Sequence, residues 1–156
     1  MNNHHGIDAF RVSMRDIDLN GHVHNSVYLD YFEDAVVNQL RAIEMIGYFR
    51  PATSGVSYHV KKCEAIFLHP LTVDDVVIPH VYIEKLGNSS LTFTIRLEID
   101  KESELKSESG INDKPLFCAE GKLVWVCVNI DDNKPRPIPQ ETRELLTAKF
   151  AFIEAK

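Results

Sequence analysis

The stretch Arg15-Asp-Ile-Asp-Leu-Asn-Gly-His-Val-His-Asn-Ser-Val-Tyr28 joins turn-forming polar residues directly to an apolar-striped segment. Apolar residues then recur at spacings of three and four as far as Ile46, which predicts one amphipathic helix of roughly twenty residues. Asn25 or Ser26 can cap the start of this helix, and Gly47 suits the position just past its end. A helix start offers unpaired N–H groups and a positive dipole end. It can therefore bind an anion, or an oxygen that becomes one during a reaction.

Alternating apolar residues predict strands before and after this helix. From Val56 to the end of its strand at His69-Pro70, the alternation changes parity near Lys61-Lys62, which indicates a bulge. Pro79 favours an edge or bulged position, because proline cannot donate to a strand ladder. The last strand is apolar on both faces, as expected of a central strand. The other expected strands are Ala9 to Met14, Val76 to Leu86, Leu91 to Ile99 and Leu116 to Ile130.

Hairpin links between the later strands imply an antiparallel sheet. One sheet and one dominant helix give the predicted fold class, α+β, with the sheet packed on that helix. Turns, connectors and a closing helix complete the order. They are expected at Phe49 to Gly55, Asp74-Asp75, Gly87-Asn88-Ser89, Lys134 to Pro139 and, for the helix, Gln140 to about Ile153.

Length and composition indicate one domain over residues 1–156, with residues 1–7 and about 101–114 flexible. The net charge of −6 argues against general binding to nucleic acid or to anionic membranes. No apolar run approaches the roughly 20 residues that span a bilayer, and the first residues do not form a signal peptide. Cys63, Cys118 and Cys127 form no Cys-x-x-Cys pair, so we expect reduced, buried thiols in a cytoplasmic protein.

Several kinds of active site can be weighed against the polar stretch. His22 and His24 lie near Asp16 and Asp18, but no second ligand cluster has metal-site spacing, so no metal is expected. A Gly-x-Ser-x-Gly elbow and a phosphate-binding glycine-rich loop are absent, and the cysteines lie in strand patterns. What remains is a carboxylate beside a helix N-terminus, which suits acyl transfer to water. The alternative for a single aspartate is a turn or capping role.

The stretch from Arg15 to Ala35 resembles the signature of hotdog-fold acyl-CoA thioesterases, in the branch typified by 4-hydroxybenzoyl-CoA thioesterase. Its pattern is Asp-x-Asp-x-x-Gly, a histidine-like residue and valine, then Tyr-Leu-x-(Tyr/Phe)-Phe-Glu. Later pieces agree, and the resemblance covers about Phe10 to Leu146. It implies a curved antiparallel sheet wrapped around one long central helix. The later pieces are Phe67 to Asp75, Lys85 to Ser90, Ala119-Glu-Gly and Pro137-Ile-Pro139.

The resemblance also implies roles for single residues. The catalytic carboxylate of the family falls on Asp18, as base or nucleophile, and the backbone N–H that binds the oxyanion falls on Asn25. Gly21 and His22 fall on the glycine and histidine of the motif, whereas His24 replaces an asparagine. Glu33 matches the glutamate of the helix, where packing or contact between subunits is as compatible as chemistry. Tyr28 is expected to contact the substrate.

The implied substrate is an acyl-CoA, with coenzyme A as part of the substrate and no separate cofactor. Its phosphates need cations, for which Lys61, Lys62, Lys85 and Arg96 are candidates, and Ser89 or Ser90 can add hydroxyl contacts. The family implies a homodimer or tetramer with active sites at the subunit interface. A hotdog module that binds an acyl-CoA or acyl-carrier thioester without hydrolysing it is the alternative, and a dehydratase or hydratase would carry a different Asp/His motif.

Overall fold

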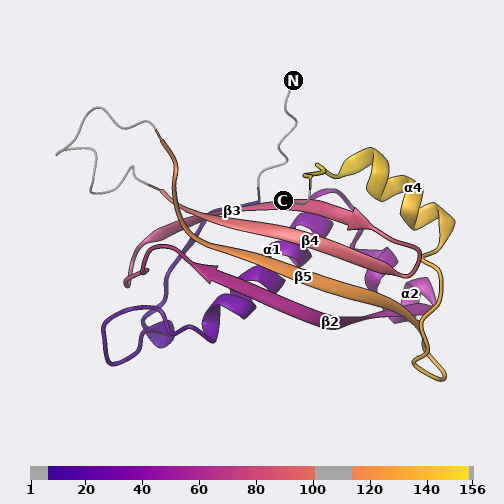
Figure 1. Cartoon of the computed structure of the whole chain (residues 1–156), viewed down its shortest axis with the longest axis horizontal. Helices are drawn as coiled ribbons and strands as arrows, with labels where there is room; N and C mark the ends of the chain where they lie inside the picture. Colours follow the sequence, from indigo (N-terminus) through magenta and orange to yellow (C-terminus); the bar gives the residue numbers. More distant parts are fainter. Residues whose placement is uncertain (1–6, 101–113, 155–156) are drawn as a thin grey trace.

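The computed structural model describes residues 7–100 and 114–154, which form one five-stranded antiparallel sheet and a set of helices. The strand order is β1-β3-β4-β5-β2, and the long helix α1 (Val27–Ala42) lies behind the sheet in Figure 1. The strands are β1 (Phe10–Arg11), β2 (Val56–Phe67), β3 (Val76–Leu86), β4 (Ser90–Ile99) and β5 (Leu116–Asn129). The other helices are α2 (Pro51–Ser54), α4 (Gln140–Lys149) and the 3-10 turns η1 (Met14–Asp16) and η2 (Ile46–Phe49).

The core lies between α1 and the inner face of the sheet. Phe32 on α1 is fully buried, and so are Phe93 and Ile95 on β4. Tyr28, Tyr31, Ala35, Val36 and Leu40 complete the buried side of α1, as its three-and-four spacing predicts. The expectation of an α+β fold with a curved antiparallel sheet around one long helix is confirmed.

The end of α1 differs from the prediction. The helix ends at Ala42, and Gly47 lies in η2 rather than just past the helix. Glu44 takes the left-handed conformation instead (φ 60°), and its N–H bonds to the Arg41 carbonyl at 3.0 Å. The N–H of Met45 bonds to the Leu40 carbonyl at 2.7 Å, which completes a Schellman motif. The Leu40 and Met45 side chains are fully buried, and this burial favours a helix end here rather than at the glycine expected from the sequence.

Two other boundaries predicted from the sequence, those of the first strand and of the closing helix, were wrong. The strand expected from Ala9 to Met14 is only Phe10–Arg11, because β3 begins at Val76 and the next residue, Val12, bonds to the Asp74-Asp75 turn instead. The chain turns into η1, where Met14 is exposed. The closing helix stops at Lys149, and the residues after it run beside β3, with the Ile83 N–H on the Ala151 carbonyl at 2.9 Å.

Other expectations are confirmed. The register of β2 shifts between Val60 and Lys62, and β5 is central, between β4 and β2. Pro79 lies in β3 opposite Leu97 and beyond the part of the strand that pairs with β1. On that side no other described strand pairs with it, so the absence of an N–H on Pro79 breaks no ladder. Asp74 lies in a turn with φ 69°. The ranges expected to be flexible lie outside the described residues, apart from Ile7, which is buried, and Lys114.

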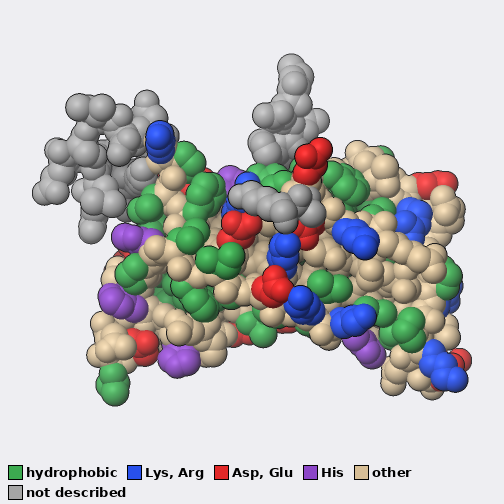
Figure 2. Space-filling view, in the orientation of Figure 1, with side chains coloured by type: hydrophobic (Ala, Val, Ile, Leu, Met, Phe, Trp, Pro, Cys, Tyr) green, Lys and Arg blue, Asp and Glu red, His purple; other side chains and the backbone are tan. Residues whose placement is uncertain are grey.

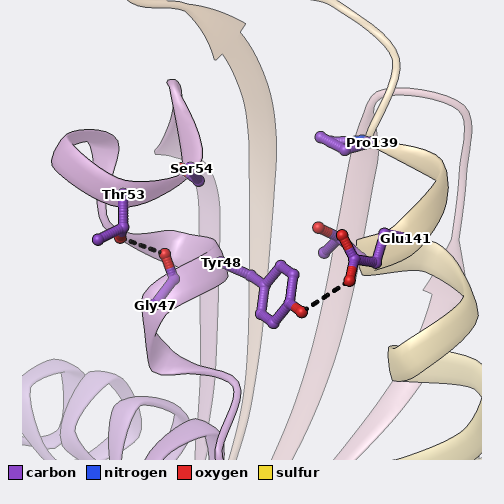
Figure 3. Close-up of a pocket in the computed structure, with 7 residues that line it drawn as sticks. Gly47, Tyr48, Thr53, Ser54, Pro139 and Glu141 are labelled. Atoms are coloured by element: carbon purple, nitrogen blue, oxygen red, sulfur yellow. Dashed lines mark hydrogen bonds between the residues drawn. The ribbon is translucent and has the colours of Figure 1, made fainter.

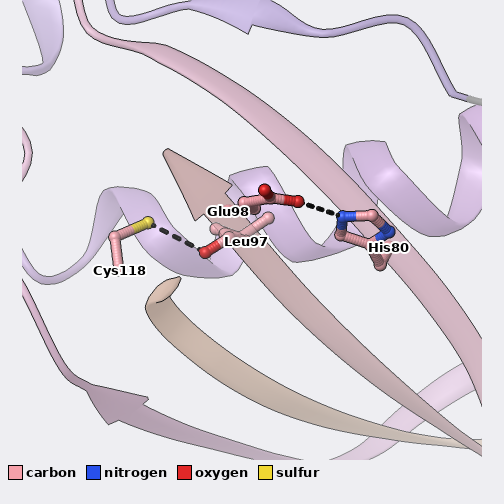
Figure 4. Close-up of polar contacts among 4 residues, drawn as sticks. All are labelled: His80, Leu97, Glu98 and Cys118. Carbon is pink, nitrogen blue, oxygen red and sulfur yellow. Dashed lines mark hydrogen bonds and ion pairs between the residues drawn. The ribbon is translucent and has the colours of Figure 1, made fainter. Parts of the chain in front are cut away.

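The outer face of the sheet carries ion pairs between strands. Figure 2 shows acidic and basic side chains intermixed across this face. The Lys122 ammonium lies 2.9 Å from the Glu84 carboxylate, and His80 Nε2 lies 2.8 Å from Glu98 (Figure 4). Arg96 pairs with Glu120 at 3.8 Å and lies over the Tyr82 ring. Among the described helices, none is long and apolar enough to cross a membrane.

Candidate active site

The connection between β1 and α1 folds into a small hairpin that carries Asp18. Ile17 and Val23 form an antiparallel bridge, and the Asp18 N–H bonds to the His22 carbonyl at 2.9 Å. The Gly21 N–H bonds to the Asp18 carbonyl at 3.0 Å, which closes the turn. Gly21 has φ 77°, a region that costs a residue with a side chain about 1 to 2 kcal/mol. The motif glycine is therefore explained by the turn, and His22 is exposed beside it.

Asp18 is half-buried at the tip of this hairpin. One carboxylate oxygen, Oδ1, accepts the Asn20 N–H at 2.8 Å, which is an Asx turn. Among the described residues, the second oxygen has no hydrogen-bond partner. Asp18 is thus oriented by its own turn and keeps an oxygen available to a ligand.

Asp16 is held differently, although it lies only two residues away. Its Oδ2 accepts the Tyr31 hydroxyl at 2.8 Å, and its other oxygen lies 3.8 Å from the Arg15 guanidinium. Its side chain is 17% exposed. Of the two aspartates in the motif, Asp16 is bonded through its side chain to α1, whereas the Asp18 side chain is bonded only within its own turn.

The His24 imidazole orients the residue that precedes α1. Ser26 occupies the N-cap position, but its side chain makes no cap hydrogen bond. The His24 Nδ1 accepts the Ser26 N–H at 3.1 Å and lies 2.8 Å from the Ser26 hydroxyl. The Val27 and Tyr28 N–H groups bond to the carbonyls of His24 and Asn25. Within the part of the chain that the structure describes, the Asn25 N–H has no partner, so it can donate to an incoming oxygen.

The hairpin is tied to the end of β2. The Val23 N–H bonds to the Leu71 carbonyl at 2.8 Å, and the Tyr28 ring packs edge-on against Phe67 at 5.0 Å between centroids. Tyr28 is 3% exposed, and its burial raises the pKa of its hydroxyl to about 12. Within one chain it is therefore a core residue below the site.

Glu33 faces β2 rather than the hairpin. Partial burial raises the pKa of the Cys63 thiol, and the nearby carboxylates of Glu33 and Glu64 add to the shift. Glu33 is half-buried. Glu33 therefore lies on the side of α1 that faces β2, the edge strand of the sheet.

The residues predicted to bind phosphate are spread over the sheet. Lys61 and Lys62 are exposed in the middle of β2, where the Lys62 ammonium lies 2.7 Å from Glu64. Lys85, Ser89 and Ser90 lie at the β3–β4 turn, at the other end of the sheet from Asp18. The ten residues of β4 separate the two ends by roughly 30 Å. Within a single chain, the structure does not bring this turn to Asp18.

A cleft of about 370 Å³ lies at that far end, between the η2–α2 segment and the start of α4 (Figure 3). Across it the Tyr48 hydroxyl donates to the Glu141 carboxylate at 3.0 Å. None of the site residues predicted from the sequence lines it. It is lined by Gly47, Tyr48, Thr53, Ser54, Pro139, Glu141 and Thr142.

The three cysteines are free thiols, but only two are buried. Cys63 is exposed, contrary to the expectation, because β2 is the edge strand of the sheet. Cys118 donates to the Leu97 carbonyl at 3.4 Å (Figure 4), and burial raises its pKa to about 12. A thiol so rarely ionised is a poor nucleophile. In residues 7–100 and 114–154, no group of three or more metal-ligating side chains is arranged to hold an ion.

Sequence reasoning missed the contact between Tyr31 and Asp16. The spacing of Tyr31 along the helix assigns it to the buried face, which is correct for its ring but says nothing of its hydroxyl. A buried tyrosine needs a hydrogen-bond partner, and the motif carries an aspartate besides Asp18 that has no other assigned role. Together these two signals could have indicated the pair.

A family model of the thioesterase-like superfamily matches residues 12–146. The chain belongs to this superfamily, since the match spans most of its length. A protein of Aquifex aeolicus named "Putative esterase" is 30% identical over 116 residues, which cover 74% of this chain and 87% of that protein. Membership supports thioesterase activity as the class of function.

Solved structures share the fold. The PA5185 protein from Pseudomonas aeruginosa has a TM-score of 0.72 and is 25% identical, with 92% of this chain and 90% of that chain covered. The BH1999 gentisyl-coenzyme A thioesterase has a TM-score of 0.70 at 19% identity, with 89% and 98% covered. The hotdog fold expected from the sequence is confirmed.

Proposed function

We propose that this protein hydrolyses an acyl-CoA to a free acid and coenzyme A. The observation that carries the proposal is the pairing of two unsatisfied groups in one short segment. Asp18 keeps a free carboxylate oxygen at the tip of its turn, and the Asn25 N–H at the start of α1 has no partner among the described residues. A base or nucleophile and an oxyanion donor are the minimum for acyl transfer to water.

In one route the Asp18 carboxylate removes a proton from water, and the resulting hydroxide attacks the thioester carbonyl. In the other route the carboxylate attacks the carbonyl itself, and water then hydrolyses the anhydride. In both routes the carbonyl oxygen becomes negative, and the Asn25 N–H stabilises it together with the positive end of α1. In both routes the tetrahedral intermediate collapses with cleavage of the C–S bond, and coenzyme A leaves as a thiolate, which is far less basic than an alkoxide. In the second route this step forms the anhydride and precedes its hydrolysis.

The proposal includes assembly through β2. This strand pairs only with β5, and in the described chain its other edge has no strand partner. Every residue from His59 to Pro70 is exposed, including the apolar Val60, Ile66 and Phe67. An unprotected edge of this length with apolar side chains invites pairing with another chain. We therefore infer a homodimer, with further association to a tetramer as an open outcome.

A two-fold contact along β2 would make the site a shared one. The Asp18 hairpin is attached near the Phe67 end of β2 through Val23 and Leu71. In an antiparallel pair, that end of one strand lies beside the earlier part of its partner, so Asp18 of one chain faces residues near His59 to Cys63 of the other. The exposed Lys61 and Lys62 then lie close enough to serve the phosphates of the nucleotide.

The test is release of free thiol from a panel of acyl-CoAs by the wild type, Asp18→Asn and Asp34→Asn. Asp18→Asn keeps the shape but removes the base, so hydrolysis should fall by roughly 10²-fold or more. Asp34 is an exposed carboxylate on α1, and its variant should match the wild type.

Each other outcome has a distinct meaning. A wild type that binds acyl-CoA but releases no thiol would be the non-catalytic binding module. Near-normal turnover by Asp18→Asn would remove Asp18 from the chemistry and leave Glu33 as the next carboxylate to test.

A further inference from the structure

A side-chain hydrogen bond joins the hairpin that carries Asp18 to α1. The Tyr31 hydroxyl donates to the Asp16 Oδ2 at 2.8 Å. Tyr31 is 7% exposed and lies one turn after the start of α1, the helix that begins two residues after Asn25. The contact therefore joins the two halves of the proposed catalytic pair.

Asp16 stands at the base of the hairpin. Its carbonyl accepts the His24 N–H at 2.9 Å, and the Ile17–Val23 bridge follows directly. A rotation or shift of Asp16 must therefore move both limbs of the hairpin. The tip with Asp18 lies two residues beyond this base, so its place relative to α1 depends on the base.

The ring of Tyr31 is fixed independently of its hydroxyl. It packs against Phe10 at 4.8 Å and against Tyr28 at 5.9 Å between centroids. Burial, followed by the hydrogen bond to Asp16, raises the pKa of the hydroxyl well above its usual range. The hydroxyl thus stays protonated and remains a donor to Asp16 at neutral pH.

We propose that Asp16 and Tyr31 are positioning residues, whose hydrogen bond sets the Asp18 carboxylate at reacting distance from a carbonyl held by the Asn25 N–H; this rests on the proposed function. Asp16, the first aspartate of the motif, then positions the site, and Asp18, the second, carries out the chemistry. A misplacement of about 1 Å in such a site can cost on the order of 10²-fold in rate.

The test compares two tyrosine variants. Tyr31→Phe removes the hydroxyl and keeps the ring in its aromatic contacts. Tyr48→Phe is the matched control, because it removes the same kind of tyrosine–carboxylate bond, to Glu141, at the far end of the molecule. We expect Tyr31→Phe to lower kcat by roughly 10- to 10²-fold with KM little changed, and Tyr48→Phe to retain the wild-type kcat.

Variants at Asp16 separate geometry from charge. Asp16→Asn keeps an oxygen that can accept from Tyr31, whereas Asp16→Leu does not. Asp16→Asn should stay within a few-fold of the wild-type kcat, and Asp16→Leu should fall with Tyr31→Phe. Equal activity of the two Asp16 variants, or an unchanged kcat in Tyr31→Phe, would overturn the proposal.

A second readout does not depend on turnover. Hydrogen–deuterium exchange of the peptide that covers residues 16–24 should be faster in Tyr31→Phe than in Tyr48→Phe, because the hairpin has lost its attachment. Unchanged exchange there would refute the attachment itself. An inactive wild type whose hairpin still loosens in Tyr31→Phe would instead refute the proposed function and leave the structural link standing.

Discussion

The ring of Phe32 lies directly against the backbone of Gly121. A Cβ atom built on Gly121 would lie 2.5 Å from the Phe32 Cε2, far inside van der Waals contact. Gly121 is in the middle of β5, opposite Ile95 on one side and Ala65 on the other. Helix α1 therefore makes a close approach to the sheet at this point, and only glycine leaves room for the ring.

This contact gives the first prediction. Gly121→Ala should lower the free energy of unfolding by about 1 to 3 kcal/mol, because the ring or the helix must move away from a well-packed sheet. Gly47→Ala is the control, since the nearest atom to its added Cβ is the Thr53 hydroxyl at 3.9 Å. Urea unfolding of the two variants and the wild type measures the difference. Equal midpoints for all three proteins would contradict the close approach.

The sequence predicted the elements well and their ends less well. Alternation and helical spacing report which face is buried, so the strands from Val56 onward and the register shift near Lys61 were predictable. The end of α1 was not, because Glu44 adopts a left-handed conformation that its residue type does not favour. The Met45 N–H bonds to the Leu40 carbonyl and both side chains are fully buried, which helical spacing alone does not report.

The candidate site was predictable from one motif, but its support was not. Asp18, Gly21 and Asn25 are neighbours in sequence, so their grouping followed from the motif alone. The bond from Tyr31 to Asp16 crosses from helix to hairpin, and helical spacing cannot report it. The exposure of Cys63 depends on which strand lies at the edge, which is a property of the strand order rather than of β2 itself.

The second prediction concerns the oxyanion donor. Asn25→Pro removes the backbone N–H, which should lower kcat on the order of 10²-fold, whereas Asn25→Ala keeps the N–H and should have a much smaller effect. The comparison is made by steady-state hydrolysis of one acyl-CoA, with circular dichroism to confirm that both variants are folded. Equal activity of two folded variants would show that the Asn25 N–H does not bind the oxyanion.

The third prediction concerns the lysines of β2. Lys61 and Lys62 are exposed, and one of them already pairs with Glu64. Contacts of exposed charges are worth about 0.2 to 1 kcal/mol each, so the double change to alanine should raise KM for acyl-CoA roughly 2- to 30-fold. It should also weaken the dependence of KM on salt, because fewer charges meet the phosphates.

Two controls separate phosphate binding from damage to the fold. Hydrolysis of a short thioester without the nucleotide should not change in the double variant. Lys134→Ala removes an exposed cation from the β5–α4 connection and should leave KM unaltered. An equal loss on both substrates would indicate that the double change harms the fold or the assembly instead.

The last prediction is assembly through the open edge of β2. Val60 is 47% exposed on this strand, and Ile130, just past the end of β5, is 48% exposed. A lysine at either position should hardly change the free energy of unfolding of a single chain, because both side chains already reach water. Only Val60→Lys places two charges against each other across a two-fold contact along β2, so only this variant should dissociate the dimer.

Light scattering should give the wild type and Ile130→Lys at least twice the 17.8 kDa of one chain, and Val60→Lys should move toward a single chain. Because the proposed site is shared between chains, the specific activity of Val60→Lys should fall on dilution while that of Ile130→Lys holds. A monomeric wild type with full thioesterase activity would refute both the assembly and the shared site.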